Sequence, residues 1–196
     1  MMSKLTLKPR SSVLLVVDMQ DFFLHENSHA YVQNKKRIIK NIKKLIKSYK
    51  TKNLPIIFTR HIGSNNSLAN KWWSRPLFKK NPFSKLSSEL INLVKDYKNY
   101  FIIEKPEYDA FYNTNLDNLL KKLRISQIVI SGVATHLCCE TTVRSAFCRG
   151  FEVFIPKDGT ESFKKKYKDA SLLNLAHGFA VIVNSVKEIC ETLNDL

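Results

Sequence analysis

Short apolar runs of strand length recur along the chain, and each is followed by a longer segment with helical periodicity. The runs occupy residues 13–18, 55–59, 100–103, 127–131, 151–155 and 179–183, and the helical segments 31–52, 84–97, 114–123, 138–149, 165–177 and 186–193. Strands that alternate with helices indicate a mostly parallel sheet with helices on both faces. The sequence therefore predicts an α/β fold. Residues 61–83 carry several Gly, Asn and Pro residues, and we expect a long loop or a lid there.

The chain length and composition fit one globular domain over residues 1–196. Hydrophobic residues make up 44% and charged residues 25%, as is usual for this class. The first apolar run, 13–17, is too short for a signal peptide or a membrane span. The four cysteines show neither CxxC spacing nor a disulfide framework. We therefore expect a cytoplasmic protein with reduced thiols and no membrane partner.

The net charge of +15, from 32 Lys and Arg against 17 Asp and Glu, is unusually high. A basic excess is one signature of nucleic-acid binding. Many of these lysines, however, share the polar side of segment 31–52, opposite an apolar side, as in an amphipathic surface helix. No nucleic-acid-binding motif accompanies them, so we interpret them as a solvated face and expect no nucleic-acid partner. A basic binding or scaffold protein is the non-enzyme alternative.

Residues 131–146 read Ser-Gly-Val-Ala-Thr-His-Leu-Cys-Cys-Glu-Thr-Thr-Val-Arg-Ser-Ala and follow an apolar run. The pattern predicts a helix with Cys138 in its first turn. The field of a helix N-terminus favours a thiolate there, and the unpaired N–H groups can hold a developing oxyanion. The alternative is a buried cysteine that acts as a small hydrophobe, which is our interpretation of Cys139, Cys148 and Cys190.

Two further residues stand at predicted strand ends. Asp18 ends the first strand and Lys105 follows the third, while Cys138 follows the fourth. Because ligands bind beyond the carboxyl ends of parallel strands, all three residues are expected at one edge of the sheet. Asp18 can act as a general base toward the thiol, and Lys105 can stabilise the thiolate. Each alone is equally consistent with an ordinary loop or cap residue.

Three segments together resemble the isochorismatase-like cysteine hydrolase family. They read Leu-Leu-Val-Val-Asp-Met-Gln-Asp-Phe-Phe at 14–23, Glu-Lys-Pro-Glu-Tyr-Asp-Ala-Phe at 104–111 and Gly-Val-Ala-Thr-His-Leu-Cys at 132–138. In the family they carry the catalytic aspartate, lysine and cysteine, here Asp18, Lys105 and Cys138. The resemblance covers nearly the whole chain. It implies a three-layer α/β/α, Rossmann-like fold with a six-stranded parallel sheet, a small-molecule substrate, no cofactor, and a homodimer or homotetramer.

The resemblance also implies a mechanism. A cis peptide between Val133 and Ala134 turns the amides of Ala134 and Cys138 into an oxyanion hole. Cys138 then forms a thioester with an amide or ureido carbonyl, while Asp18 moves the protons. An isochorismatase-type hydrolase that cleaves a vinyl ether is the alternative within the same fold.

Nicotinamidases of this family carry an Asp-x-His metal motif after the second strand, where this chain has Thr59, Arg60 and His61. The acid is missing, so we expect no metal, and this argues against nicotinamidase activity. Several further residues near strand ends or in the expected lid are candidates for substrate binding, with packing in the core or in a subunit contact as the alternative. They are Gln20, His61, Trp72, Trp73, Tyr108, Phe111, Val133 and Thr135.

Overall fold

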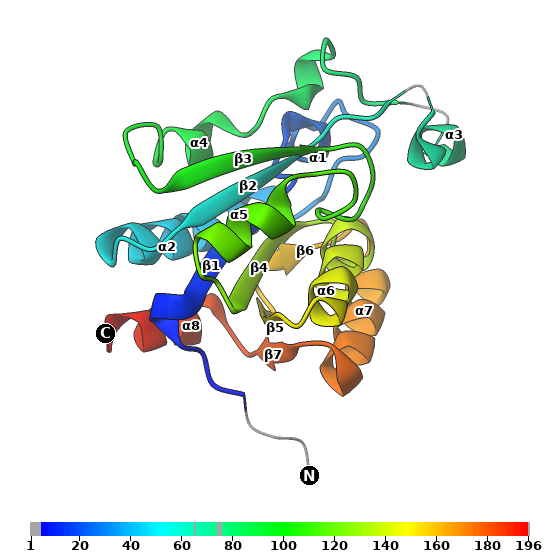
Figure 1. The fold of residues 1–196 in the computed structure, drawn as a ribbon. Coiled ribbons are helices and arrows are strands. Elements are labelled where there is room, and N and C mark those ends of the chain that lie inside the picture. The colour runs from blue at the N-terminus through cyan, green and yellow to red at the C-terminus, as the bar shows by residue number, and fades with distance from the viewer. Residues whose placement is uncertain (1–4, 65, 74–75, 196) are drawn as a thin grey trace.

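The computed structural model describes residues 5–64, 66–73 and 76–195. Its centre is a parallel sheet with the strand order β3-β2-β1-β4-β5-β7, and β6 pairs with the end of β4 (Figure 1). The strands are β1 (Ser12–Val17), β2 (Ile56–His61), β3 (Tyr100–Lys105), β4 (Gln127–Val133), β5 (Glu152–Pro156), β6 (Thr160–Glu161) and β7 (Val181–Val183). The predicted α/β class and parallel sheet are therefore confirmed, with β6 as an unpredicted seventh strand.

Helices cover both faces of this sheet and make three layers (Figure 1). One face packs against α2 (Lys35–Thr51), α4 (Ser88–Ile91) and α8 (Val186–Asn194), and the other against α5 (Leu116–Lys122), α6 (Glu140–Cys148) and α7 (Lys165–Gly178). The remaining helical elements are α1 (Asp21–Leu24), α3 (Leu68–Trp73), the short 3-10 turns η1 (Pro9–Ser11) and η2 (Pro82–Ser84), and the π-helical turn η3 (Thr135–Cys139).

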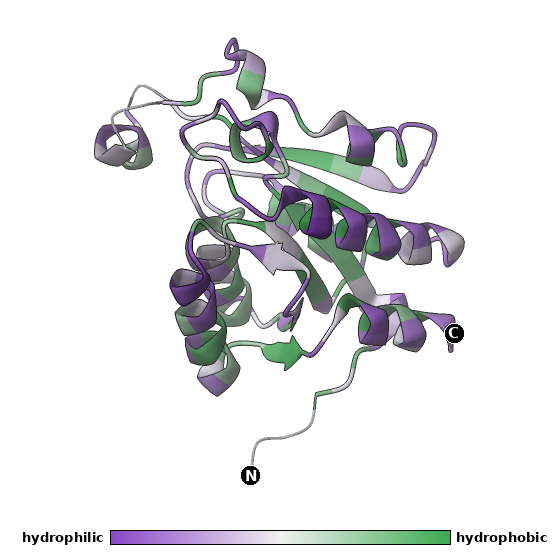
Figure 2. Ribbon diagram, turned by 180° about the vertical axis from the view of Figure 1, so that it is seen from behind, coloured by the Kyte–Doolittle hydropathy of each residue, from purple (hydrophilic) through white to green (hydrophobic). Residues whose placement is uncertain are grey.

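Side-chain alternation along β1 shows why the strand is buried on both sides. Leu14 and Val16 join the core under α2, whereas Val13, Leu15 and Val17 join the core under α5 and α6. The apolar stripe of α2 meets the first of these cores, so its lysines face outward, as the colours in Figure 2 show. A parallel sheet needs both faces covered, and this pattern provides two hydrophobic surfaces.

Two predicted segments differ from the structure. The helix expected over 84–97 is only α4, Ser88–Ile91, and the chain then continues in turns such as Val94 N–H to Ile91 and Tyr97 N–H to Val94. These turns still bury Leu90 and Val94, which explains the helix-like spacing of the apolar residues. The segment expected as a long loop or a lid over 61–83 contains the end of β2, the helix α3 and most of η2, and its residues 65, 74 and 75 lie outside the described part of the chain.

Within the described part of the chain, no helix combines the length and the apolar character that crossing a membrane requires.

Candidate active site

The carboxyl ends of β1 and β3 and the beginning of η3 bring Asp18, Lys105 and Cys138 together. Lys105 Nζ lies 2.7 Å from Asp18 Oδ2, and both side chains are fully buried. The Cys138 thiol lies close enough to both groups that each of them changes the pKa of the thiol. In the sequence, Lys105 lies 87 positions after Asp18, and Cys138 lies 33 positions after Lys105, so the fold brings together residues that are far apart along the chain.

Lys105 is held by two backbone carbonyls in addition to Asp18. Its Nζ donates to the carbonyl oxygens of Glu107, at 2.9 Å, and Tyr108, at 3.2 Å. Burial disfavours the charged ammonium, but the neighbouring Asp18 carboxylate opposes this effect, and the pKa of Lys105 is raised. Lys105 is therefore a permanent buried cation.

Asp18 sits in a left-handed backbone conformation with φ of 48°, directly after β1. Its carboxylate Oδ1 accepts a hydrogen bond from the Thr59 hydroxyl at 2.6 Å, and its own backbone N–H donates to the same hydroxyl oxygen at 3.0 Å. Beside it, Gly132 has φ of 124°, and a Cβ there would lie 2.1 Å from the carbonyl oxygen of Val17. This close approach of β4 to the end of β1 requires glycine.

Cys138 lies in the π-helical turn that leads into α6, not in the first turn of a regular α-helix. Burial is the largest effect on its thiol and raises its pKa, although the charge of Lys105 opposes this. The helix field was expected to favour a thiolate, but desolvation of the charged sulfur outweighs it. At rest Cys138 is therefore a neutral thiol, and proton transfer must accompany any attack.

The peptide bond between Val133 and Ala134 is cis. Ala134 and Cys138 both line the same cavity, so the backbone at this turn and the sulfur face one space. Positioned backbone N–H groups next to a nucleophile are the usual donors to an oxyanion.

The cavity in front of Cys138 has a volume of about 160 Å³. Its wall comes from α1 and the loop after it, the end of β2, α3 and the segment that follows it, the loop after β3, the η3 turn, and Phe163 in the loop after β6. Besides Ala134 and Cys138, the wall consists of Phe22, Phe23, His29, Ala30, His61, Ala69, Asn70, Trp73, Leu77, Tyr108, Leu137 and Phe163. None of these described residues is a lysine, an arginine, an aspartate or a glutamate.

His61 is a buried polar residue of the cavity wall whose ionisation is strongly perturbed. It is 8% exposed, and its Nδ1 has no hydrogen-bond partner among the described residues. Burial, followed by the charge of Lys105, lowers its pKa to about 4. His61 is therefore neutral at physiological pH.

Three of the eight substrate-binding candidates line the cavity: His61, Trp73 and Tyr108. Trp73 and Tyr108 also contact each other, since the Trp73 Nε1–H donates to the Tyr108 hydroxyl. Trp72, in contrast, is 76% exposed on the outer side of α3 and is absent from the cavity wall.

The other candidates lie beneath or beside the cavity. Gln20 is fully buried. Its amide accepts a hydrogen bond from the His61 N–H and donates to the carbonyls of His61 and Ser84, so it connects β2 to η2.

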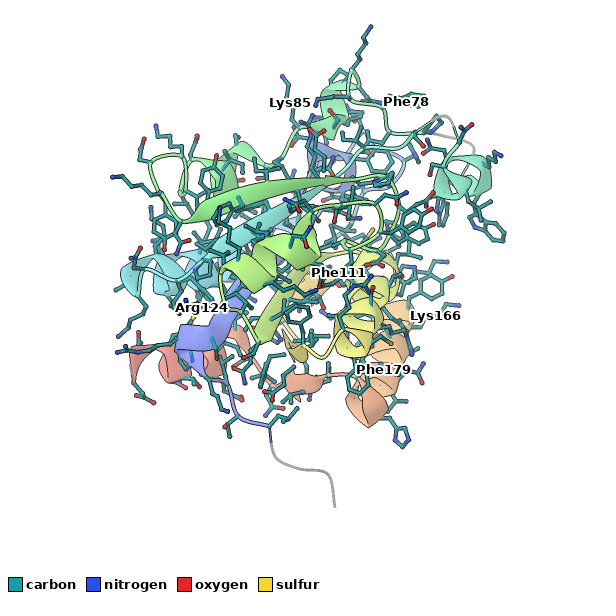
Figure 3. All side chains as sticks on the ribbon, viewed as in Figure 1. Phe78, Lys85, Phe111, Arg124, Lys166 and Phe179 are labelled. Atoms are coloured by element: carbon teal, nitrogen blue, oxygen red, sulfur yellow. The ribbon has the colours of Figure 1, made fainter. Side chains whose placement is uncertain are left out.

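The Thr135 hydroxyl donates to the Glu161 carbonyl, and Val133 is buried at the end of β4. Phe111 packs beside α6 under the Arg149 guanidinium, which lies 4.7 Å from its ring centre (Figure 3).

Sequence reasoning missed Thr59 as a partner of Asp18 and missed most of the apolar wall. Phe22 and Phe23 stand in the quoted first motif, so their place after Asp18 was a usable signal. Leu77 lies in segment 61–83, which was expected to form a loop or lid and to line the pocket, but Leu77 itself was not singled out; Phe163 follows the unpredicted strand β6, and the sequence offered no signal for it.

The residues in the metal-motif position do not form a ligand set. The Thr59 hydroxyl is engaged with Asp18, and the Arg60 guanidinium bonds to Ser84 and Glu104. His61 is then the one remaining donor of the three, without the hard oxygen ligand that the motif requires. Among the described residues, no three His, Cys, Asp or Glu side chains are grouped for a metal ion.

Comparison with known proteins agrees with this architecture. Residues 12–186 match the family model described as the isochorismatase domain. Nicotinamidase 3 from Arabidopsis thaliana is 34% identical over 186 residues, which cover 91% of this chain and 88% of that protein. The ureidoacrylate amidohydrolase RutB from Serratia proteamaculans is 24% identical over 207 residues, covering 94% and 84%.

Among solved structures, a cysteine hydrolase from Pseudomonas syringae pv. phaseolicola superposes with a TM-score of 0.88 and 23% identity, and 99% of each chain is covered. That similarity supports the three-layer fold. The family model, which spans most of the chain, and the nicotinamidase relative together show which family the chain belongs to. The chain therefore belongs to the isochorismatase family of hydrolases.

Proposed function

We propose that this protein is a metal-independent cysteine hydrolase that cleaves a C–N bond in a small amide or ureido substrate through a thioester on Cys138. One observation carries the proposal: a thiol, a carboxylate and an ammonium group are in mutual contact in full burial, directly under a cavity. A buried acid–base pair that contacts a nucleophile is the arrangement that covalent catalysis requires.

The geometry supports the following sequence of steps. Asp18 accepts the Cys138 proton as the sulfur attacks the substrate carbonyl, and Lys105 stabilises the negative charge that moves onto sulfur. The amides of Ala134 and Cys138 hold the tetrahedral oxyanion. Asp18 then returns the proton to the departing amine. A water molecule that Asp18 deprotonates finally hydrolyses the thioester, which releases the carboxylic acid and restores the thiol.

The relatives support the reaction class. The names nicotinamidase and ureidoacrylate amidohydrolase both denote hydrolysis of an amide-type C–N bond. The missing metal motif argued against nicotinamidase activity, whereas a nicotinamidase is 34% identical to this chain. The metal motif therefore does not identify the acyl group of the substrate, and we infer it from the residues that line the cavity.

The test compares wild type with Cys138→Ala and with Cys139→Ala as the matched control, because Cys139 is the adjacent buried cysteine. Product formation is followed for nicotinamide, ureidoacrylate, an N-carbamoyl amino acid and isochorismate. We expect C–N hydrolysis that Cys138→Ala abolishes and Cys139→Ala retains, with an acyl mass on Cys138 after acid quenching. Isochorismate turnover that survives Cys138→Ala would assign the vinyl-ether reaction instead. A folded protein that turns over none of these compounds would favour the non-enzyme alternative.

A further inference from the structure

Given the proposed function, on which this step depends, we infer that the cavity accepts an uncharged acyl group the size of one ring and rejects acyl groups with a carboxylate. The Cys138 cavity has walls of aromatic faces, contributed by Phe22, Phe23, Trp73 and Phe163. Its volume of about 160 Å³ is close to that of an apolar cavity of roughly 150 Å³ that binds one benzene molecule. A flat ring therefore matches both the size and the lining.

No cation among the described residues is free to bind a substrate carboxylate in this cavity. Lys105 is not part of the described wall; its Nζ is paired with the Asp18 carboxylate at 2.7 Å and donates to the carbonyls of Glu107 and Tyr108. The described wall contains no lysine or arginine. A carboxylate would therefore lose its hydration without gaining a lysine or arginine partner from the described wall, which disfavours its binding.

The polar groups of the wall suit an uncharged substrate. The Tyr108 hydroxyl already accepts from Trp73, so its own proton can be donated to a neutral heteroatom. Burial keeps His61 neutral, and its Nδ1 has no partner among the described residues. These dipoles can orient a ring substituent without requiring charge.

The probes are benzamide and 3-carbamoylbenzoate, which differ only by one ring carboxylate. We expect kcat/KM for benzamide to exceed that for 3-carbamoylbenzoate by about a hundredfold or more. Binding of both compounds to Cys138→Ala, measured by calorimetry, should show the same order. Equal values of kcat/KM, tighter binding of the carboxylate, or no binding of benzamide would overturn the inference.

A charge variant sharpens the test. Asn70→Lys adds a cation at the partly exposed rim, and Asn70→Met is the control of similar length. The lysine variant should lower the ratio of kcat/KM for benzamide to kcat/KM for 3-carbamoylbenzoate about tenfold, whereas the methionine variant should leave this ratio unchanged. If benzamide binds Cys138→Ala but the wild type hydrolyses no amide, the proposed function fails and the cavity inference stands. If the wild type prefers ureidoacrylate, the cavity inference fails and the proposed function stands.

A separate observation concerns the base. We propose that Thr59 is a positioning residue that makes Oδ2 of Asp18 the oxygen that receives the Cys138 proton. The Thr59 hydroxyl accepts from the Asp18 N–H, so its single proton points to Asp18 Oδ1. Because that proton already occupies Oδ1, the second oxygen, Oδ2, remains to receive the thiol proton: it lies 2.7 Å from Lys105 Nζ and accepts no hydrogen bond from the described residues. All these groups are fully buried, so water does not substitute for the hydroxyl.

The test uses Thr59→Val, which is nearly isosteric, and Thr59→Ser, which keeps the hydroxyl. Alkylation of Cys138 by iodoacetamide, followed by peptide mass spectrometry over a pH series, reads deprotonation of the thiol without any substrate. We expect Thr59→Val to slow alkylation about tenfold or more at neutral pH and to displace the pH profile, and Thr59→Ser to stay near wild type. The exposed Cys148 in the same digest is the internal control and should react equally in all variants.

With an amide substrate, Thr59→Val should lower kcat while KM changes little. Thermal melting establishes that each variant is folded, so a general loss of structure is separated from a loss of positioning. An unchanged pH profile in Thr59→Val, or an equal loss in Thr59→Ser, would overturn this assignment.

Discussion

The neutral state of the buried His61 predicts a specific loss of stability in acid. Its pKa is about 4 in the folded protein, against 6.5 for an unperturbed histidine. Below pH 6.5 the unfolded chain binds a proton that the folded chain does not bind, so the free energy of unfolding falls as the pH falls. Replacement by glutamine, which is polar but does not titrate, should remove this part of the acid sensitivity.

The magnitude follows from the two pKa values. The interval from 6.5 down to about pH 5 is roughly 1.5 units, and at about 1.4 kcal/mol per unit it amounts to about 2 kcal/mol. The full contribution is reached only near pH 4, where the folded histidine begins to bind its proton. At about pH 7.5 both states are neutral and His61 contributes almost no pH dependence.

The assay is urea unfolding of wild type and His61→Gln at about pH 7.5 and about pH 5. Other groups titrate equally in both proteins, so the difference between their two pH responses isolates His61. His177→Gln, at an exposed position near the end of α7, is the control and should behave as wild type. If His61→Gln loses as much stability between the two pH values as wild type does, the assignment of a neutral buried His61 is wrong.

Three further substitutions test the architecture. Gly132→Ala places a Cβ 2.1 Å from the Val17 carbonyl oxygen at a positive φ, so it should prevent folding or lower the free energy of unfolding by more than about 3 kcal/mol. Gly178→Ala meets no atom within 4 Å and should leave the free energy of unfolding nearly unchanged. Circular dichroism and urea melts measure both effects. Gln20→Leu removes the acceptor of the His61 N–H and one donor each from the carbonyls of His61 and Ser84, the second of which keeps Arg60 Nε, and it should cost about 2–4 kcal/mol in the same melts. Lys105→Met leaves Asp18 buried without its cation and should cost about 3–5 kcal/mol at neutral pH, part of which a second change, Asp18→Asn, should recover.

The sequence predicted the convergence of Asp18, Lys105 and Cys138 because strand ends are readable from apolar runs. Parallel strands end at one edge, so three residues that follow three strands lie at that edge. Their contact depends on the strand order β3-β2-β1-β4 and on the reach of the Lys105 side chain across it, which the apolar runs did not predict. The family motifs carried the same three positions independently.

The cavity wall could not be predicted in the same way. Leu77 lies beyond α3, and Phe163 follows the two-residue strand β6; neither element has a length that periodicity can detect. Gln20 had the polarity and the position of a substrate ligand, but its amide is fully used by the backbone of β2 and η2. A single sequence does not distinguish a side chain that lines a cavity from one that hydrogen-bonds to the backbone beneath it.

The central place of β1 has a consequence for folding during synthesis. Among the described strands β1 is made before the others and lies inside the sheet, and its register partner on one side, Gln127 opposite Ser12, is made more than a hundred residues later. Contacts of such sequence separation form slowly. Pairing with β2 covers only the other edge of β1, so until β4 is made the first edge is open to pairing with other chains.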